Sequence, residues 1–474
     1  MTNYIIDGHS LTLARGENTL LNNCSFQVRR GEQILLTGAS ASGKSSLALA
    51  LAGKLYISGE VQFNFTPANN KTAKVTLIEQ YFKFKDNFGS GNFYYQQRYN
   101  SYDADNTPTV AQSINYSVSN STLNYLLDIL HLTHRLNAPL IQLSSGERKK
   151  LQLILALAKP SQIIILDNPF IGIDAASKNN LINHLSGLAN NGITFILIDD
   201  SKDIPSFINT VMSIENQSIS KIPVSQYKLS HQKMDNQRLS ISINLPEPKV
   251  EYSNIIKFDN VNIAYGQKQV LQNLSWQVAI GEKWLLQGVN GAGKSTLLSL
   301  INGDHPQAYA NKIELFGKPR GSGETIWDIK RQIGYVSPEL HWNFNTSMSC
   351  LNTILSGFFD TIGLYRHATE EQISQARNYL EQLNLQNYAD KALAQVSAGI
   401  QRIMLLLRAL VKNPPLFIFD EPCQGLDDAQ SKFFVDLIDQ LFATSKHTII
   451  YVSHREDQIP RCINKILKLK PITN

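Results

Sequence analysis

The stretch Gly288-Val289-Asn290-Gly291-Ala292-Gly293-Lys294-Ser295-Thr296 decides the fold, because it has the form G-x-x-x-x-G-K-S of a phosphate-binding loop. An apolar run at 284–286 precedes it, and a run that favours a helix at 297–301 follows it. This order of strand, glycine-rich loop and helix is the context that the motif requires. The backbone N–H groups of such a loop, together with the helix N-terminus, surround a phosphate group.

The side chains of this loop fit a nucleotide and its metal ion. Lys294 can reach the β- and γ-phosphates, and the Ser295 hydroxyl can ligate Mg²⁺. A glycine-rich turn with a purely structural role would not need the Lys-Ser pair. We expect the following residues to bind the nucleotide: Gly288, Asn290, Gly291, Gly293, Lys294, Ser295 and Thr296.

The composition is that of a globular protein with more than one domain. A chain of 474 residues is too long for one ordinary core, so about two to four domains are expected. The net charge of +5 permits a nucleic-acid or acidic-membrane partner without requiring one. The cysteines contain no C-x-x-C pair, so neither a disulfide framework nor a zinc site is indicated.

The sequence contains no sign of a secretory or membrane-spanning segment. No basic segment followed by an apolar core opens it, and no apolar run reaches the roughly 18–20 residues that span a bilayer. We therefore expect a cytoplasmic protein, and any role at the inner face of the membrane would need a separate subunit.

The first half of the chain repeats the same succession of motifs. Residues 38–45, Gly38-Ala39-Ser40-Ala41-Ser42-Gly43-Lys44-Ser45, form a second G-x-x-x-x-G-K-S loop. The offsets between the copies are 250 residues from Lys44 to Lys294, 253 from Ser144 to Ser397 and 253 from Asp167 to Asp420. Motifs in one order at one spacing indicate a duplicated domain of about 220 residues.

The duplication predicts the domain organisation. We expect one domain at 1–220 and its copy at 255–474, joined by a linker at 221–254. The linker is polar and shows no long periodic pattern, so it is expected to be a short extended tether. Apolar strands bounded by helical stretches predict an α/β fold with a mainly parallel sheet covered on both faces.

An irregular region at 81–109 is rich in aromatic residues, with Lys83, Lys85 and Arg98 interleaved. Such a mixture could stack single-stranded bases. The alternative is a loop whose rings pack on their own domain or on a partner subunit. We favour this second interpretation, because Gly, Asn and Asp residues interrupt any regular platform.

The combined pattern resembles the ATP-binding cassette (ABC) ATPases. It consists of a phosphate loop, an L-S-x-G-E/Q segment at 143–147 and 396–400, and an apolar strand that ends in an acidic residue. The segments 273–278, 303–307 and 320–328 resemble the ModF type of tandem cassette protein, which is described as a molybdate-transport ATP-binding protein or as a photorepair protein. Neither molybdate nor DNA damage is indicated by any single residue.

The resemblance implies fold, cofactors and partners. It implies two P-loop NTPase cassettes in tandem, each with a mainly parallel sheet core, an antiparallel β-subdomain and a helical subdomain. ATP and Mg²⁺ are the implied cofactors, and a separate membrane-embedded transporter subunit is the implied partner. In such proteins two cassettes dock head to tail, so that Ser144 and Gly146 would face the second loop, and Ser397 and Gly399 the first.

The resemblance also assigns roles around the second loop. Asp420 would hold Mg²⁺ through water, and Glu421 would act as general base on the attacking water. His454 would donate a hydrogen bond to the γ-phosphate, and Tyr265 would stack on adenine. The proposed catalytic residues are therefore Glu421, His454 and Lys294.

The first loop retains its phosphate and metal ligands but departs from the family pattern elsewhere. The expected nucleotide contacts are Gly38, Ser40, Gly43, Lys44, Ser45 and Ser46, and the expected metal ligands are Ser45, Asp167 and Gln80. Asn168 stands where Glu421 stands in the other copy, and an amide cannot accept a proton from water. Asp199 or Asp200 replaces His454, and Arg15 replaces Tyr265.

The facing segment of the first loop also departs from the pattern, with Ala398 and Ile400 where Gly and Gln or Glu are usual. The second copy in turn has no counterpart of Gln80, the glutamine that meets Mg²⁺ and couples to partner subunits. The hypothesis is one hydrolytic site and one that mainly binds ATP, in an ATPase of a transport system. The alternatives are a switch protein acting on nucleic acid or ribosomes, and an ATP-bound scaffold with little turnover.

Overall fold

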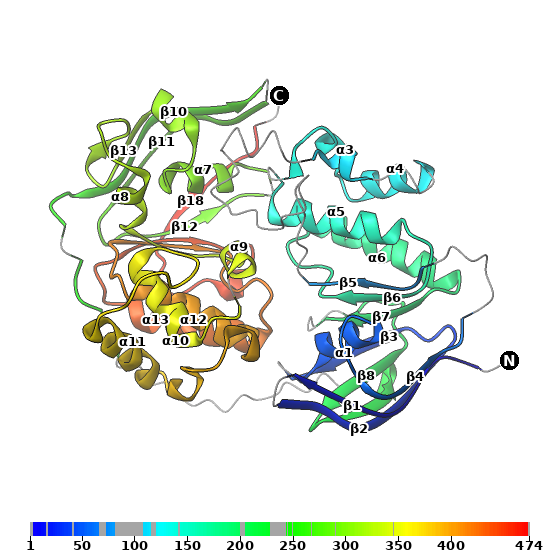
Figure 1. Cartoon of the computed structure of the whole chain (residues 1–474). Coiled ribbons are helices and arrows are strands. Elements are labelled where there is room, and N and C mark those ends of the chain that lie inside the picture. Colours follow the sequence, from blue (N-terminus) through cyan, green and yellow to red (C-terminus); the bar gives the residue numbers. More distant parts are fainter. Residues whose placement is uncertain are drawn as a thin grey trace. The chain divides into compact units, whose positions relative to one another are not determined.

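The chain forms two compact units that divide near Lys233. Figure 1 shows both in a computed structural model, coloured along the sequence. The described residues are 3–15, 18–39, 42–65, 73–80, 108–114, 120–140, 143–199, 204–227, 243, 245–248, 250–266, 268–289, 291–344 and 346–472. Unit 1 precedes the division, and unit 2 contains Met234–Asn474.

Unit 1 contains an antiparallel and a mainly parallel sheet. The antiparallel sheet has the order β2-β1-β4, with β1 Tyr4–Arg15, β2 Asn18–Arg29 and β4 Ser58–Phe63. The other sheet has the order β5-β6-β7-β3-β8-β9, and only β8 and β9 are paired antiparallel. Its strands are β3 Ile34–Gly38, β5 Ala73–Ile78, β6 Ser161–Asp167, β7 Thr194–Ile198, β8 Thr210–Glu215 and β9 Ser218–Pro223.

The helices described in unit 1 connect these strands and cover the parallel sheet. They are α1 Lys44–Leu51, α3 Val110–Ser113, α4 Asn120–Ile129, α5 Ser145–Leu157 and α6 Ala175–Asn190, with short 3-10 turns η2 Thr133–Arg135 and η4 Val224–Gln226. The helix α1 follows the first phosphate loop directly, as the sequence predicts.

Unit 2 repeats the plan. Its antiparallel sheet has the order β11-β10-β13-β14, with β10 Asn254–Tyr265, β11 Lys268–Ala279, β13 Lys312–Leu315 and β14 Lys318–Pro319. Its parallel sheet has the order β15-β16-β17-β12-β18, with β12 Lys283–Gln287, β15 Ile333–Val336, β16 Leu416–Asp420, β17 Thr448–Val452 and β18 Lys465–Lys468. The strand order matches that of unit 1, which fits the predicted duplication.

The helical part of unit 2 is described in full apart from one residue. Its helices are α7 Lys294–Ile301, α8 Ile326–Lys330, α9 Pro338–Asn343, α10 Cys350–Leu355, α11 Glu370–Gln382, α12 Ala398–Leu410 and α13 Asp428–Phe442. The 3-10 turns are η5 Pro306–Ala310, η6 Ser356–Phe359, η7 Gln386–Tyr388, η8 Leu393–Gln395 and η9 Glu456–Gln458. Among the residues that the structure describes, no helix has both the length and the apolar character to cross a membrane.

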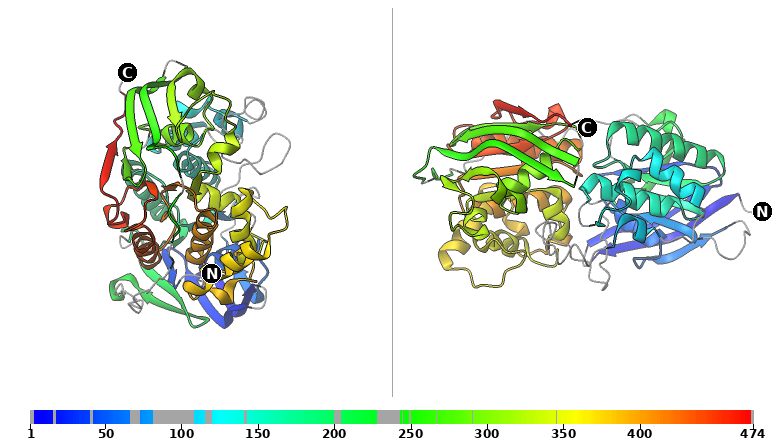
Figure 2. Two further views of the ribbon diagram at one scale, coloured as in Figure 1. Left: turned by 90° about the vertical axis from the view of Figure 1, so that its left-hand side faces the viewer. Right: turned by 90° about the horizontal axis from the view of Figure 1, so that it is seen from above.

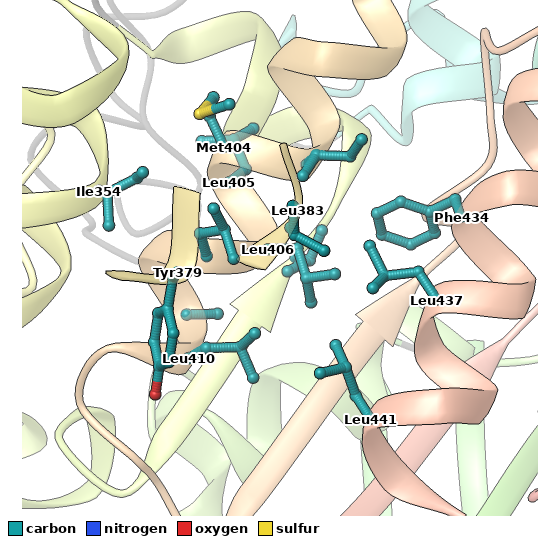
Figure 3. Close-up of a cluster of buried hydrophobic side chains, with 14 of the residues drawn as sticks. Ile354, Tyr379, Leu383, Met404, Leu405, Leu406, Leu410, Phe434, Leu437 and Leu441 are labelled. Atoms are coloured by element: carbon teal, nitrogen blue, oxygen red, sulfur yellow. The ribbon is translucent and has the colours of Figure 1, made fainter. Parts of the chain in front are cut away.

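Alternating side chains of the parallel strands fill two cores in each unit. In unit 2, Phe417 and Phe419 of β16 pack with the helices α10–α13, and Figure 3 shows part of this cluster. Leu416 and Ile418 of the same strand pack with α7 and the antiparallel sheet. Figure 2 shows that sheet (green) over the parallel strands (orange and red). The predicted α/β fold, with both sheet faces covered, is therefore confirmed.

The segment between the repeats is only partly described. Unit 1 continues past residue 220, because β9 ends at Pro223. Ile243 is buried in the helical core of unit 2, and Leu245 packs against that core. Glu247 pairs with Lys446 at 2.9 Å. The end of the predicted tether therefore lies against unit 2. The aromatic stretch from Tyr81 lies outside the described residues as far as residue 107.

The helical core of unit 2 is expected to decide the stability of that unit. Leu406 of α12 is fully buried, so Leu406→Ala should lower the free energy of unfolding by about 2–5 kcal/mol. All four tryptophans of the chain lie in unit 2, so urea unfolding followed by tryptophan fluorescence reports this unit. Tyr365→Ala is the control, because Tyr365 is 81% exposed and should change stability by less than about 0.5 kcal/mol. Equal midpoints for the two variants would contradict the expectation.

Candidate nucleotide site

The lysine makes the same hydrogen bonds in both phosphate loops. In unit 2, the Lys294 ammonium donates to the carbonyl oxygens of Gly288 at 2.6 Å and Val289 at 3.2 Å. In unit 1, Lys44 makes the corresponding bonds to Gly38 at 2.6 Å and to the next carbonyl at 3.2 Å. The lysine thus lies along each loop, where it can meet phosphate oxygens. These bonds give no sign that unit 1 has lost its phosphate-binding loop.

A left-handed glycine begins the helix after each loop. Gly43 has φ 106° and Gly293 has φ 95°, and both are the N-caps of their helices. A side chain at this φ is strained, so glycine is required for the chain to turn into the helix. The next turn is anchored by buried Ser46 in unit 1 and buried Thr296 in unit 2.

The acidic end of β16 lies next to the second loop. Asp420 and Glu421 both act electrostatically on Lys294, although burial lowers the pKa of that lysine. Burial, Glu421 and Glu339 together raise the pKa of Asp420 to about 7, while the Tyr335 hydroxyl donates to it at 3.3 Å. A cation beside these carboxylates would offset the electrostatic cost of holding their negative charges close together in a buried place.

The donor set fits Mg²⁺ held together with phosphate oxygens. Mg²⁺ is usually bound by one or two carboxylates, waters and the substrate's phosphates rather than by a protein cage. Ser295 is the second residue of α7 and Asp420 ends β16, so a hydroxyl and a carboxylate are available in unit 2. Within the described part of the chain, no group of three His, Cys, Asp or Glu residues is arranged to hold a metal alone.

Glu421 is held on both of its carboxylate oxygens. His454 Nε2 lies 3.1 Å from Oε1, and the Gln424 amide donates to Oε2 at 3.0 Å. The backbone of Glu421 has φ 46°, a left-handed conformation that costs a residue with a side chain of order 1–3 kcal/mol. A carboxylate kept in a strained conformation at the end of a buried strand is typical of a functional site.

Comparisons with known proteins identify the family of the chain. The family described as "ABC transporter" matches residues 21–171 and 271–424. The "ABC transporter ATP-binding protein ModF" of Escherichia coli (strain K12) is 36% identical over 98% of this chain and 97% of its own length. An "Uncharacterized ABC transporter ATP-binding protein C323.04" of Schizosaccharomyces pombe is 29% identical over 94% of each chain.

The chain belongs to the ABC transporter family. It is a tandem ATP-binding cassette protein, and it binds nucleotide and hydrolyses ATP as that family does. A third relative, the "Manganese transport system ATP-binding protein MntB" of Bacillus subtilis, is 34% identical over 42% of this chain and 76% of its own length.

The two cassettes share their backbone where their chemistry differs. Asn168 has φ 46°, as Glu421 has, and its N–H bonds to Ile198 O at 2.9 Å. The N–H of Glu421 makes the same bond to Val452 O at 3.0 Å. Asparagine adopts this conformation more readily than glutamate. Unit 1 therefore keeps the turn with a residue that suits it and lacks the carboxylate.

The strand register also identifies the counterpart of His454. Asp420 pairs with Val452 in unit 2, and Asp167 pairs with Ile198 in unit 1. The second residue after each strand is then His454 in unit 2 and Asp200 in unit 1. Asp200 lies outside the described residues, as do the predicted contacts Asn290 and Ser40.

The predicted adenine contact stands apart from the acidic groups, on the antiparallel sheet. Tyr265 is the last residue of β10 and pairs with Lys268 of β11. Arg15 is the last residue of β1 and pairs with Asn18 in the same way, so the sequence alignment of these two residues is correct. The Tyr265 side chain is exposed at the surface, and Arg15 is exposed as well.

The two L-S-x-G-E/Q segments begin long helices, but they are capped differently. Ser144 accepts from the N–H of Glu147 at 3.2 Å, and the Glu147 carboxylate accepts from the N–H of Ser144 at 2.8 Å. This reciprocal capping box is strengthened by an Arg135–Glu147 ion pair of 3.0 Å. Ser397 caps α12 through one bond of 3.4 Å, because Ile400 replaces the glutamate.

The segment after β5 in unit 1, which contains Gln80, differs from the matching segment after β15 in unit 2. The Gln80 carbonyl accepts from buried Lys149 at 3.2 Å, which fixes the chain after β5. Ile78 and Val336 occupy matching register positions, so Pro338 corresponds to Gln80. The next residue, Glu339, is buried and contributes to the field at Asp420. Sequence reasoning missed this carboxylate, because only the strand register shows that it follows the same sheet edge.

Gly146 is required at the start of α5 by a close backbone contact. A Cβ atom there would lie 2.2 Å from the Gly172 carbonyl oxygen. Gly146→Ala should therefore shift the helix and lower stability by about 1–3 kcal/mol in thermal unfolding. Gly399→Ala is the matched control, because the atoms nearest to its Cβ belong to the flexible Gln430 side chain, at 3.0 Å. Equal losses in the two variants would show that the Gly172 contact is not decisive.

Proposed function

We propose that the cassette of unit 2 carries the hydrolytic site and that the cassette of unit 1 mainly binds ATP. The observation that carries this proposal is the position of Glu421. Its backbone is left-handed, and its carboxylate contacts His454 and Gln424. Asp420 and Lys294 lie beside it. Its counterpart in unit 1 is the amide of Asn168. We propose two cassettes at about 1–220 and 255–474 joined by a linker, although β9 carries the first cassette on to Pro223.

The residues of unit 2 would each have a separate role in hydrolysis. Glu421 accepts the proton of the attacking water, and Lys294 offsets the charge of the β- and γ-phosphates. Ser295 and Asp420 would hold Mg²⁺, which supplies electrostatic stabilisation of the phosphate oxygens when bound. His454 donates a hydrogen bond to the γ-phosphate, once it leaves the Glu421 carboxylate.

The proposal includes head-to-tail pairing of the two cassettes. In that pairing Ser144 and Gly146 close the loop of unit 2, where the well-capped N-terminus of α5 faces the γ-phosphate. Ser397 and Gly399 close the loop of unit 1. Lys44, Ser45, Asp167 and Gln80 would hold ATP and its metal there without a general base.

The assignment of Glu421 can be tested by an amide exchange in each cassette. Glu421→Gln should lower kcat for ATP by about 10²–10⁴-fold, because a general base is lost. Asn168→Gln places the same amide at the same backbone position of unit 1 and should leave kcat within about twofold. Steady-state phosphate release measures both. An unchanged rate in Glu421→Gln would refute the assignment.

We further propose that hydrolysis serves an ABC transport system through a separate membrane subunit. Two relatives support this, one named as an ABC transporter ATP-binding protein and one as part of a manganese transport system. Molybdate is the first cargo to test, on the family resemblance alone. The rival is a switch on nucleic acid, which the net charge of +5 permits.

Purification from native membranes separates transport from the rival. With Mg²⁺ and ATP in the Glu421→Gln variant, a polytopic membrane protein should co-purify in detergent and depart when ATP is removed. Recovery of nucleic acid instead, with binding lost steeply as salt is raised, would favour the rival. The wild-type chain without nucleotide is the control for adventitious capture.

A further inference from the structure

His305 lies directly behind the predicted adenine contact. Its Nε2 is 2.8 Å from the Tyr265 hydroxyl, and the two ring centroids are 5.8 Å apart. His305 is 1% exposed, whereas Tyr265 is 44% exposed. One residue is therefore fixed inside the cassette, and the other presents part of its ring to the surface.

The direction of the hydrogen bond follows from the other ring nitrogen. His305 Nδ1 accepts from the N–H of Gln307 at 3.2 Å, so Nδ1 carries no proton. The neutral ring then carries its proton on Nε2 and donates it to the Tyr265 oxygen. Burial lowers the pKa of His305 to about 4, which keeps the ring neutral near pH 7.

The strand that carries Tyr265 is held by two side-chain amides. Gln307 accepts from the N–H of Ala264 at 3.2 Å and donates to its carbonyl at 2.7 Å. Asn311 makes the same double contact to Asn262, at 2.8 and 3.1 Å. The neighbouring strand β13 pairs with β10 only from Ile256 to Asp259, so these amides take the place of a strand partner beyond that point.

Unit 1 lacks this arrangement as a whole. Arg15 stands at the position of Tyr265. Leu55 follows the left-handed Gly53 by two residues, as His305 follows the left-handed Gly303. The tyrosine and the histidine are thus present together in one cassette and absent together from the other.

We propose that His305 is a positioning residue that fixes the Tyr265 ring for stacking on the base of the nucleotide in unit 2. The segment from His305 to Asn311 forms the support of this platform, through its bonds to the Tyr265 hydroxyl and to the strand before it. This inference rests on the proposed function, in which Tyr265 contacts adenine. It gives a role to a segment, 303–307, that the phosphate chemistry does not use.

The test separates base contacts from phosphate contacts in the full chain. Every protein carries Lys44→Ala, which weakens binding at the first loop. The variants are His305→Leu, Tyr265→Phe, the double variant and Tyr265→Ala, where leucine is the residue of unit 1. Calorimetric titration measures the Kd for two probes, ATP and inorganic triphosphate, which has no base to stack.

The expected result is a loss confined to ATP. His305→Leu and Tyr265→Phe should each raise the Kd for ATP by about 3–10-fold, because one hydrogen bond is removed in both. The double variant should have about the same Kd for ATP as each single variant, since the bond between the two side chains can be lost only once. The Kd for triphosphate should stay unchanged, and with Lys44 intact KM should rise while kcat is retained.

Different failures are distinguishable. If Tyr265→Ala weakens ATP and His305→Leu does not, or if the two single effects add in full, the positioning role is overturned while the adenine contact stands. If Tyr265→Ala leaves the Kd for ATP unchanged, the adenine contact of the proposed function fails. An equal loss for triphosphate in His305→Leu would show a general structural role and overturn the inference.

Discussion

The parallel pairing of β12, β17 and β16 is the constraint on which the site in unit 2 depends. The loop with Lys294 leaves β12, the residue His454 follows β17, and Asp420 with Glu421 ends β16. Because the carboxyl ends of parallel strands meet at one sheet edge, residues about 160 positions apart become neighbours. The buried alternation of apolar side chains on both sheet faces fixes this register, since a one-residue slip would move every strand side chain from one core into the other, where it does not fit.

The same constraint explains why unit 1 has the same backbone at this sheet edge although its side chains differ. Its strands have the same order and its loop has the same lysine bonds. The left-handed turn after β6 is kept with φ 46°, and Asn168 suits that turn better than a glutamate does. In unit 2 the strain at Glu421 is offset by the packing around it. The asymmetry between the cassettes therefore lies in side chains on a common backbone.

The sequence was sufficient to predict the fold, the duplication and both phosphate loops, because each depends on local pattern. Lys294 and Ser295 follow from spacing within one loop, and the expected role of Tyr265 follows from the family resemblance. It was not sufficient to reveal His305 or Gln424, since each acts on a side chain whose position depends on a turn or on another sheet edge. Glu339 was missed for a related reason, because the expected glutamine position holds Pro338 and the carboxylate comes one residue later.

The paired differences between unit 1 and unit 2 have a physical explanation. Gln424 supports Glu421, and its counterpart beside Asn168 is Ile171; His305 supports Tyr265, and its counterpart beside Arg15 is Leu55. Without the carboxylate or the tyrosine, partly buried Gln424 and buried His305 would each lose a hydrogen bond, and an unpaired buried polar group costs of order 1–3 kcal/mol. An apolar residue at the supporting position removes that cost and gains contact with the core, as Leu55 does. The apolar residues at the two supporting positions of unit 1 therefore fit the absence of a carboxylate and a tyrosine beside them.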